Sequence, residues 1–212
     1  MLEHTLEDIT GVPQHILKDG LHRKRPCVAQ IISWAAKRTT TRVGDKAYSL
    51  MGLLGVNMPM LYGEGKTVFH HLQLEIIHTS NDQSIFAWGH NKTLLHTGSV
   101  LASDLSCFEG CSHLELLDYK KFIKSLDECF PGKELPLIRE DRFGVFPITN
   151  HGIQIWMPLC HYRDPDTIFK AYLPCRDQGR LVVTIDLAFW DFNYYRHSLT
   201  VDEFPARGSL EF

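Results

Sequence analysis

Apolar positions repeat with helical spacing through the first ninety residues. From Val28 to Ala36 they recur every three or four positions, which predicts a helix that ends near Arg38. The same spacing continues from Ala47 to Leu54, where Gly55 provides a stop signal. A third helix is predicted over residues 65–79. Its inward face consists of Phe69, Leu72 and Ile76.

The period changes from helical to alternating after residue 82. Residues 84–88 are predicted to form a short strand, and alternation dominates after residue 142. Residues 90–142 are the least regular and are expected to hold short helices and loops. The predicted fold class is α+β, with an amino-terminal helical block over residues 1–90 and a mainly antiparallel, β-rich accessory domain over residues 91–212. The predicted strands lie in 153–159, 169–175 and 181–189, and Asn150-His151-Gly152 is predicted to form a hairpin turn.

Composition narrows the class of protein. The chain has 212 residues, 44% of them hydrophobic and 22% charged, which is typical of a globular protein. A formal net charge of -3 gives no overall positive field, so we expect no nucleic-acid partner. There is no apolar run of the roughly 18 residues that a membrane span needs, and the acidic start does not resemble a signal peptide. We therefore expect a cytoplasmic protein whose six cysteines are reduced thiols.

The segment Gly63-Glu64-Gly65-Lys66 has some features of a phosphate-binding loop. Such a loop needs a further glycine five places before Gly65, where Met60 stands, and a buried strand before it. We therefore favour a glycine-rich entry into a helix. The two glycines would let the backbone turn sharply and present Glu64.

Three other groups of residues have ligand or nucleophile chemistry. The first group is a loose cluster of Cys107, Cys111, His113 and Cys129. A zinc site has paired short spacings on both sides, whereas the far side of this cluster offers Cys129 alone. His71, Glu75 and His78 share one helix face, but one helix supplies too few ligands for a metal site. Cys160 and His161 are neighbours next to a strand end, so their side chains point to opposite faces and could not easily pair with each other. We therefore favour buried or loop thiols and a solvated helix face, and we assign no catalytic or metal-ligating residue and no cofactor.

Polar residues gather next to the densest apolar segments of the helical block. Arg42 and Asp45 are expected to form a buried ion pair that holds the second helix, because charges inside a core need partners. Tyr48, Tyr62 and Glu64 belong to the same group. A structural role is favoured over a catalytic one, since networks that stabilise a fold also gather such groups.

Residues 32–88 closely resemble the segment just downstream of the core in fungal heterokaryon-incompatibility (HET) domain proteins. A weaker resemblance continues through residues 148–153 and 158–159 to Tyr195-Arg196. The signature residues are Arg42, Asp45, Tyr48, Asn57, Pro59, Tyr62, Gly63, Glu64 and Gly65, with further matches at Leu72-Gln73, Glu75-Ile76 and Ser84-Ile85-Phe86-Ala87-Trp88.

This chain departs from the family pattern in three respects. Gly44 stands where the family usually has an acidic residue, and His71 stands where arginine is common. The defining amino-terminal part of the family has no counterpart in this sequence. That part is similar to Toll/interleukin-receptor domains, which implies that any NAD-cleaving chemistry would lie there. The resemblance therefore transfers no catalytic residue to this chain.

The resemblance implies the non-catalytic portion of a self/non-self recognition and programmed cell death protein. In this hypothesis the chain is a scaffold or a recognition surface for protein partners, other HET-type proteins among them. One alternative is a stand-alone regulator that binds full-length HET proteins. A less favoured alternative is a hydrolase that uses the Tyr62–Glu64 turn or the Cys and His residues.

Overall fold

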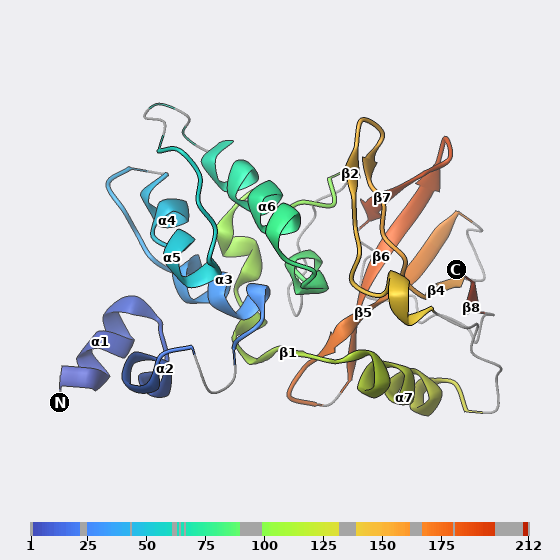
Figure 1. Cartoon of the computed structure of the whole chain (residues 1–212), viewed down its shortest axis with the longest axis horizontal. Coiled ribbons are helices and arrows are strands. Elements are labelled where there is room, and N and C mark those ends of the chain that lie inside the picture. The colour runs from blue at the N-terminus through green and yellow to red at the C-terminus, as the bar shows by residue number, and fades with distance from the viewer. Residues whose placement is uncertain are drawn as a thin grey trace. The chain divides into compact units, whose positions relative to one another are not determined.

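The chain folds into two compact units. The first comprises Met1–His90 with Leu101–Glu115, and the second comprises Asn91–Val100 with Leu116–Phe212. Helices fill the first unit and antiparallel strands dominate the second, so the predicted α+β class is confirmed (Figure 1). The computed structural model describes residues 2–21, 25–42, 44–60, 63, 65, 67–89, 99–131, 139–161, 167–179, 181–197 and 210–211.

The first unit is built around the helix α3. Nearly every side chain of α3 is buried, as expected of a helix that is apolar on all sides. It ends at Ala36, close to the predicted end near Arg38. Residues 101–115 pack with this unit although they follow residue 90 in the chain. The elements of the unit are α1 (Leu2–Thr10), α2 (Gln14–Asp19), α3 (Val28–Ala36), α4 (Asp45–Tyr48), α5 (Met51–Leu54), α6 (Thr67–Thr79), and the 3-10 helices η1 (Gln83–Phe86), η2 (Leu105–Phe108) and η3 (Cys111–His113).

The apolar segment from Ala47 to Leu54 forms part of two short helices, α4 and α5, instead of one continuous helix. Gly55 ends α5 in the left-handed conformation, with φ of 71°, so the predicted stop is confirmed. Arg25 Nη2 donates a hydrogen bond to the Leu54 carbonyl at 3.0 Å. This bond satisfies one of the carbonyl groups that a helix leaves unpaired at its end.

The third predicted helix is confirmed, but the strand predicted after it is wrong. Helix α6 buries Phe69, Leu72 and Ile76 as expected. Residues 84–88 do not form a strand, because the Asp82 side chain accepts a hydrogen bond from the Ser84 amide and starts the 3-10 helix η1. Local bonds of this kind compete with the ladder bonds of a sheet.

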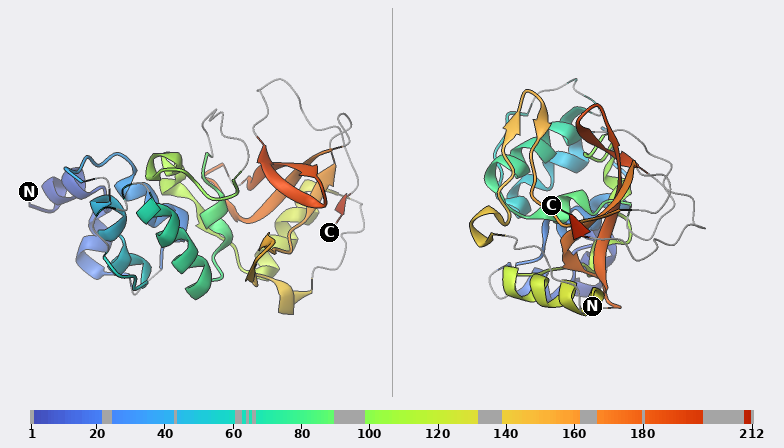
Figure 2. Two further views of the ribbon diagram at one scale, coloured as in Figure 1. Left: turned by 90° about the horizontal axis from the view of Figure 1, so that it is seen from above. Right: turned by 90° about the vertical axis from the view of Figure 1, so that its right-hand side faces the viewer.

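The second unit contains a six-stranded sheet in the order β7-β6-β5-β4-β8, with β1 also joined to β5. The long strands β5 and β6 lie side by side along its centre (Figure 2). Burial alternates along β6, as the sequence predicts for 181–189, whereas β5, predicted as a strand over 169–175, is buried at nearly every position. The elements are β1 (Glu115–Leu116), α7 (Tyr119–Cys129), the 3-10 helix η4 (Glu140–Arg142), β2 (Ile148–Thr149), β3 (Gly152–Ile153), β4 (Leu159–His161), β5 (Ile168–Arg176), β6 (Val182–Trp190), β7 (Asn193–His197) and β8 (Leu210–Glu211).

The hairpin predicted around Asn150 is confirmed, but the strand predicted over 153–159 is interrupted. Strands β2 and β3 pair antiparallel, with Thr149 opposite Gly152. Strand β3 ends at Ile153 and β4 begins at Leu159. Residue Pro158, just before β4, lacks the amide hydrogen that a continuous ladder would require.

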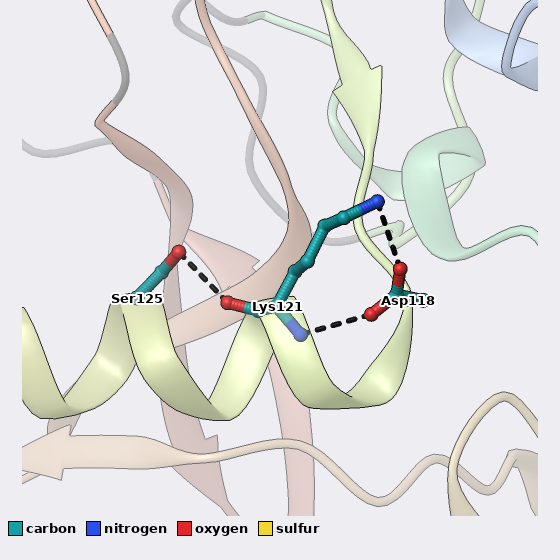
Figure 3. A network of polar contacts seen from close by, with 3 residues as sticks. All are labelled: Asp118, Lys121 and Ser125. Carbon is teal, nitrogen blue, oxygen red and sulfur yellow. Dashed lines mark hydrogen bonds and ion pairs between the residues drawn. The ribbon is translucent and has the colours of Figure 1, made fainter.

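Helix α7 lies in the stretch that the sequence pattern marks as least regular. Asp118 caps its start, since Oδ1 accepts a hydrogen bond from the Lys121 amide at 2.9 Å and Oδ2 pairs with Lys121 Nζ at 2.9 Å (Figure 3). The bonds from Lys121 lower the pKa of the Asp118 carboxyl. The helix buries Phe122 and Leu126 against Tyr172 and Cys160 of the sheet.

The turn between β6 and β7 holds two residues in a strained conformation. Asp191 has φ of 49° and Phe192 has φ of 60°, in a two-residue turn closed by the pair Trp190 and Asn193. Tight hairpins of this type favour Asn-Gly, because left-handed backbone is costly for other residues. The Phe192 side chain is 89% exposed, so burial does not offset this cost.

We therefore expect Phe192→Gly to raise the free energy of unfolding of the second unit by about 0.5–1 kcal/mol. The glycine removes the left-handed strain and sacrifices little buried surface. Phe192→Ala is the matched control, because it removes the ring but keeps the strain. Urea unfolding followed by circular dichroism measures both variants, and an equal gain in the two would refute the strain argument.

Candidate functional site

The start of α3 is joined to η1 by one buried carboxylate. Asp82 Oδ2 accepts a hydrogen bond from the Val28 amide at 2.8 Å, and Oδ1 accepts one from the Ser84 amide at 2.9 Å. The side chain of Ser84 then accepts a bond from the Ala29 amide at 3.0 Å. Negative charge at a helix amino terminus stabilises the helix dipole. These bonds fix η1 to the central helix.

Cys27 lies beside this carboxylate and is held as an unreactive thiol. Its Sγ contacts the Leu114 carbonyl at 3.6 Å. Burial, and then the nearby negative charge of Asp82, raise the pKa of Cys27 to about 11. The thiol therefore stays protonated at neutral pH and lacks the thiolate that nucleophilic chemistry needs.

Helix α6 is joined to the segment around Ala102 through Gln73, whose side chain has no solvent exposure. Its Nε2 donates to the Ala102 carbonyl at 2.9 Å, and its Oε1 accepts from the Ala102 amide at 2.9 Å. The side-chain amide of Gln73 thus pairs with both backbone groups of Ala102, as a neighbouring strand would. Asp82 thus joins α3 to η1, and Gln73 joins α6 to the segment around Ala102, within the first unit.

Two signature residues, Arg42 and Asp45, are exposed on the first unit, so the expected buried ion pair is wrong. They are linked through the backbone, where the Asp45 amide donates to the Arg42 carbonyl at 3.1 Å. The Thr40 hydroxyl donates to the same carbonyl at 2.7 Å. The two charges lie where solvent already stabilises them, so they need no partner inside the core.

The half-buried ring of Tyr48 packs close to the backbone at Gly44. A Cβ placed on Gly44 would lie 3.2 Å from Val68 Cγ2 and 3.4 Å from Tyr48 Cε2. A side chain at this position would require Val68 to shift by a few tenths of an ångström, and it would be in ordinary contact with Tyr48. This packing gives a physical reason for the small residue at position 44.

The signature segment after α5 alternates between buried and exposed residues. Val56 and Met58 are buried, whereas Asn57 and Pro59 are exposed. The buried pair anchors the segment to the first unit. Asn57 and Pro59 are consequently held at the surface, where they can contact another molecule.

Glycine is required at two exposed positions of the signature by backbone conformation. Gly63 has φ of 106° and Gly65 has φ of 57°, and a Cβ at either position would meet nothing within 4 Å. Other residues would be strained at these angles even though there is space for them. Tyr62 and Glu64 lie outside the described residues.

The residues considered as metal ligands are dispersed within the described part of the chain. Cys107 and Cys111 are buried in the first unit, and Cys111 Sγ contacts the Ala87 carbonyl at 3.6 Å. Cys129 belongs to the second unit and is exposed. Among the described residues there is no group of three or more His, Cys, Asp or Glu that could hold a metal. His71 and His78 are exposed on α6.

Cys160 and His161 have separate surroundings on β4. Cys160 is buried in the cluster beneath α7, together with Tyr172. The His161 ring packs edge-on against Phe169, with 4.4 Å between the ring centroids. Their register partners on β5, Lys170 and Phe169, follow each other along the strand, so the two side chains point to opposite faces.

Burial predicts that one of the six thiols reacts quickly in the folded chain. Cys129 is exposed and the other five are buried. We expect a disulfide reagent, with absorbance as the readout, to modify one thiol per chain before unfolding and six after it. Partial burial, and then Glu128, raise the pKa of Cys129, so its reaction should be slower than that of free cysteine.

The matched variant for the thiol prediction is Cys129→Ser, which should lose the fast phase entirely. Fast modification of two or more thiols in the folded chain would contradict the assigned burial.

Comparison with known proteins gives one short but specific match. A segment of 65 residues, 31% of this chain, is 42% identical to the vegetative incompatibility protein HET-E-1 of Podospora anserina. The chain covers about 5% of the length of that relative. No family model and no solved structure matches. The match supports a relationship to fungal heterokaryon-incompatibility proteins over this segment.

None of the helices in the described part of the chain could cross a membrane. The longest of them with an assigned span, α6, has 13 residues. A span needs roughly 20 predominantly apolar residues.

Proposed function

We propose that this chain is a non-catalytic portion of a fungal HET-type protein of self/non-self recognition and programmed cell death. Within it, the first unit acts as a scaffold that presents a recognition surface, and the protein is cytoplasmic. The recognition surface is defined by Arg42, Asp45, Asn57 and Pro59. The similarity to a vegetative incompatibility protein supports the recognition context.

The observation that carries this proposal is the exposure of four signature side chains on the folded first unit. Arg42, Asp45, Asn57 and Pro59 are exposed, and none of them fills the core. Packing alone therefore does not require these residue types. Rigid elements that present polar side chains at the surface are typical of binding sites. The partners we propose are proteins, and other HET-type proteins are the first candidates.

The test is the affinity of the whole chain for HET-E-1 of Podospora anserina, measured by biolayer interferometry. The wild-type chain is expected to bind, and Arg42→Ala/Asp45→Ala is expected to weaken binding about tenfold, as for two residues central to an interface. The matched control is Lys120→Ala/Asp127→Ala on α7, which also removes one cation and one anion from exposed positions.

The control should keep wild-type affinity. No binding by the wild-type chain would overturn the proposal, and equal loss in the two double variants would remove the assignment of the surface. Emission of Trp34 and Trp88, which are buried in the first unit, verifies that each variant is folded.

A further inference from the structure

Positive charge is concentrated in the connection between α3 and α4. Lys37, Arg38, Arg42 and Lys46 lie within ten residues, with Asp45 as the single acid among them. The chain as a whole has a formal net charge of -3. Lys37 and Arg42 are exposed, while Arg38 and Lys46 are partly exposed. We call these four cations the basic turn.

Hydrogen bonds close the basic turn on itself. Arg38 Nη1 donates to Ser49 Oγ at 3.3 Å, and Ser49 Oγ in turn donates to the Lys46 carbonyl at 2.7 Å. The Thr40 hydroxyl and the Asp45 backbone amide both donate to the Arg42 carbonyl. The bond from Arg38 to Ser49 thus joins a residue just after the end of α3 to the residue that follows α4. Figure 1 shows the connection that runs between these two helices.

Helix stabilisation explains only half of this charge. Lys37 and Arg38 follow the carboxyl end of α3, where cations interact favourably with the helix dipole. Arg42 precedes α4, and Lys46 lies within this helix of four residues, which is too short for its dipole to favour a cation there. The helix dipole therefore gives no reason for a positive charge at Arg42 or Lys46.

We propose that the basic turn binds an acidic segment of a protein partner. This inference rests on the proposed function, because the basic turn shares Arg42 with the recognition surface and supplies its partner chemistry. Lys and Arg on a fixed turn complement the carboxylates of such a segment, and this complementarity sets partner choice and the rate of encounter.

The number of cations and the net charge of the chain favour an acidic protein segment over nucleic acid as the partner. Four cations neutralise few phosphates, and the overall negative charge of the chain repels a long polyanion. A short acidic segment concentrates its charge at the turn and avoids most of this repulsion.

The test uses charge reversal on the whole chain. The probes are HET-E-1, a fluorescent peptide of alternating glutamate and glycine, and a labelled single-stranded oligonucleotide. Lys37→Glu/Arg42→Glu should weaken binding of the peptide and of HET-E-1 about tenfold or more, since attractive pairs become repulsive. Raising salt from about 50 to about 300 mM should weaken wild-type binding as well.

Lys120→Glu/Lys124→Glu is the matched control, because it makes the same change of charge on exposed positions of α7. It should keep wild-type affinity for both probes. If Lys37→Glu/Arg42→Glu fails to show buried tryptophan emission, Lys37→Glu/Lys46→Glu replaces it.

The outcomes separate this inference from the proposed function. Binding of HET-E-1 that is insensitive to salt and to charge reversal overturns the inference and leaves the function standing. Peptide binding that is lost on charge reversal, without any binding of HET-E-1, supports the inference and overturns the function. Tighter binding of the oligonucleotide than of the peptide also overturns the inference.

Discussion

Asp82→Ala is expected to lower the free energy of unfolding of the first unit by about 3 kcal/mol. The Asp82 carboxylate is 8% exposed and accepts bonds from the Val28 and Ser84 amides. Its removal leaves two buried amides without acceptors and removes the negative charge from the start of the central helix. Because α3 forms the centre of this unit, the loss should reach the whole unit.

Tryptophan emission during urea unfolding measures this effect. Trp34 and Trp88 are 5% and 3% exposed, whereas Trp156 and Trp190 of the second unit are 47% and 74% exposed. The red shift on unfolding therefore reports mainly the first unit. Asp118→Ala is the matched control, since it removes the capping carboxylate of α7 in the second unit. The control should leave the midpoint of this shift unchanged, and a shift that is equal in both variants would contradict the role of Asp82.

Gln73→Leu is expected to cost the first unit about 2–3 kcal/mol, although it places a more apolar side chain in an apolar site. The side chain of Gln73 is paired with both backbone groups of Ala102. Leucine would leave that amide and carbonyl buried without partners. The cost of these orphaned groups exceeds the gain from burying extra apolar surface.

Amide hydrogen exchange gives a readout that general destabilisation would not produce. The Ala102 amide should lose its protection in Gln73→Leu well before the amides of α3 lose theirs. Gln30→Leu is the control, because the Gln30 side chain is partly exposed and donates from Nε2 to the Ser112 carbonyl at 2.8 Å, far from Ala102 in sequence. Slow exchange at Ala102 in Gln73→Leu would show that the Gln73 side chain does not protect this amide, and would contradict the prediction.

The sequence pattern is sufficient for the elements that bury one continuous apolar face. Helix α6 and strand β6 were predictable because packing one face against a core imposes a period of 3.6 or 2 on their residues. Helix α3 and strand β5 show the same periods in sequence, although both are buried on nearly every side. The same reasoning failed for η1. There the apolar run from Ile85 to Trp88 is buried on all sides, so it carries no period that separates a strand from a helix.

Helix α7 could have been found from its ends. It has a high content of charged residues, so its average hydrophobicity is low, although Phe122, Ile123 and Leu126 lie on one helical face and pack against the core cluster of the second unit. Asp118 supplies a capping residue immediately before the helix. The role of Gln73 in the first unit could also have been suspected from the sequence. It is a polar residue among the inward-facing residues Leu72 and Ile76, and a buried polar side chain needs a hydrogen-bond partner.

The sequence identified the candidate residues of the site, but it did not predict which of them are buried and which are exposed. The resemblance indicated Arg42 and Asp45, yet a charged pair near apolar residues reads equally well as buried or exposed. The structure places both at the surface. Asp82 was missed as a structural residue, because the pairing of residues 54 positions apart, as between Asp82 and Val28, leaves no local pattern.

Hydrogen exchange of the whole chain in complex with HET-E-1 tests the central claim most directly. The account predicts that binding slows exchange in peptides covering residues 37–59, with little change in peptides covering residues 167–197. Protection confined to the second unit would contradict the assignment of the recognition surface to the signature segment.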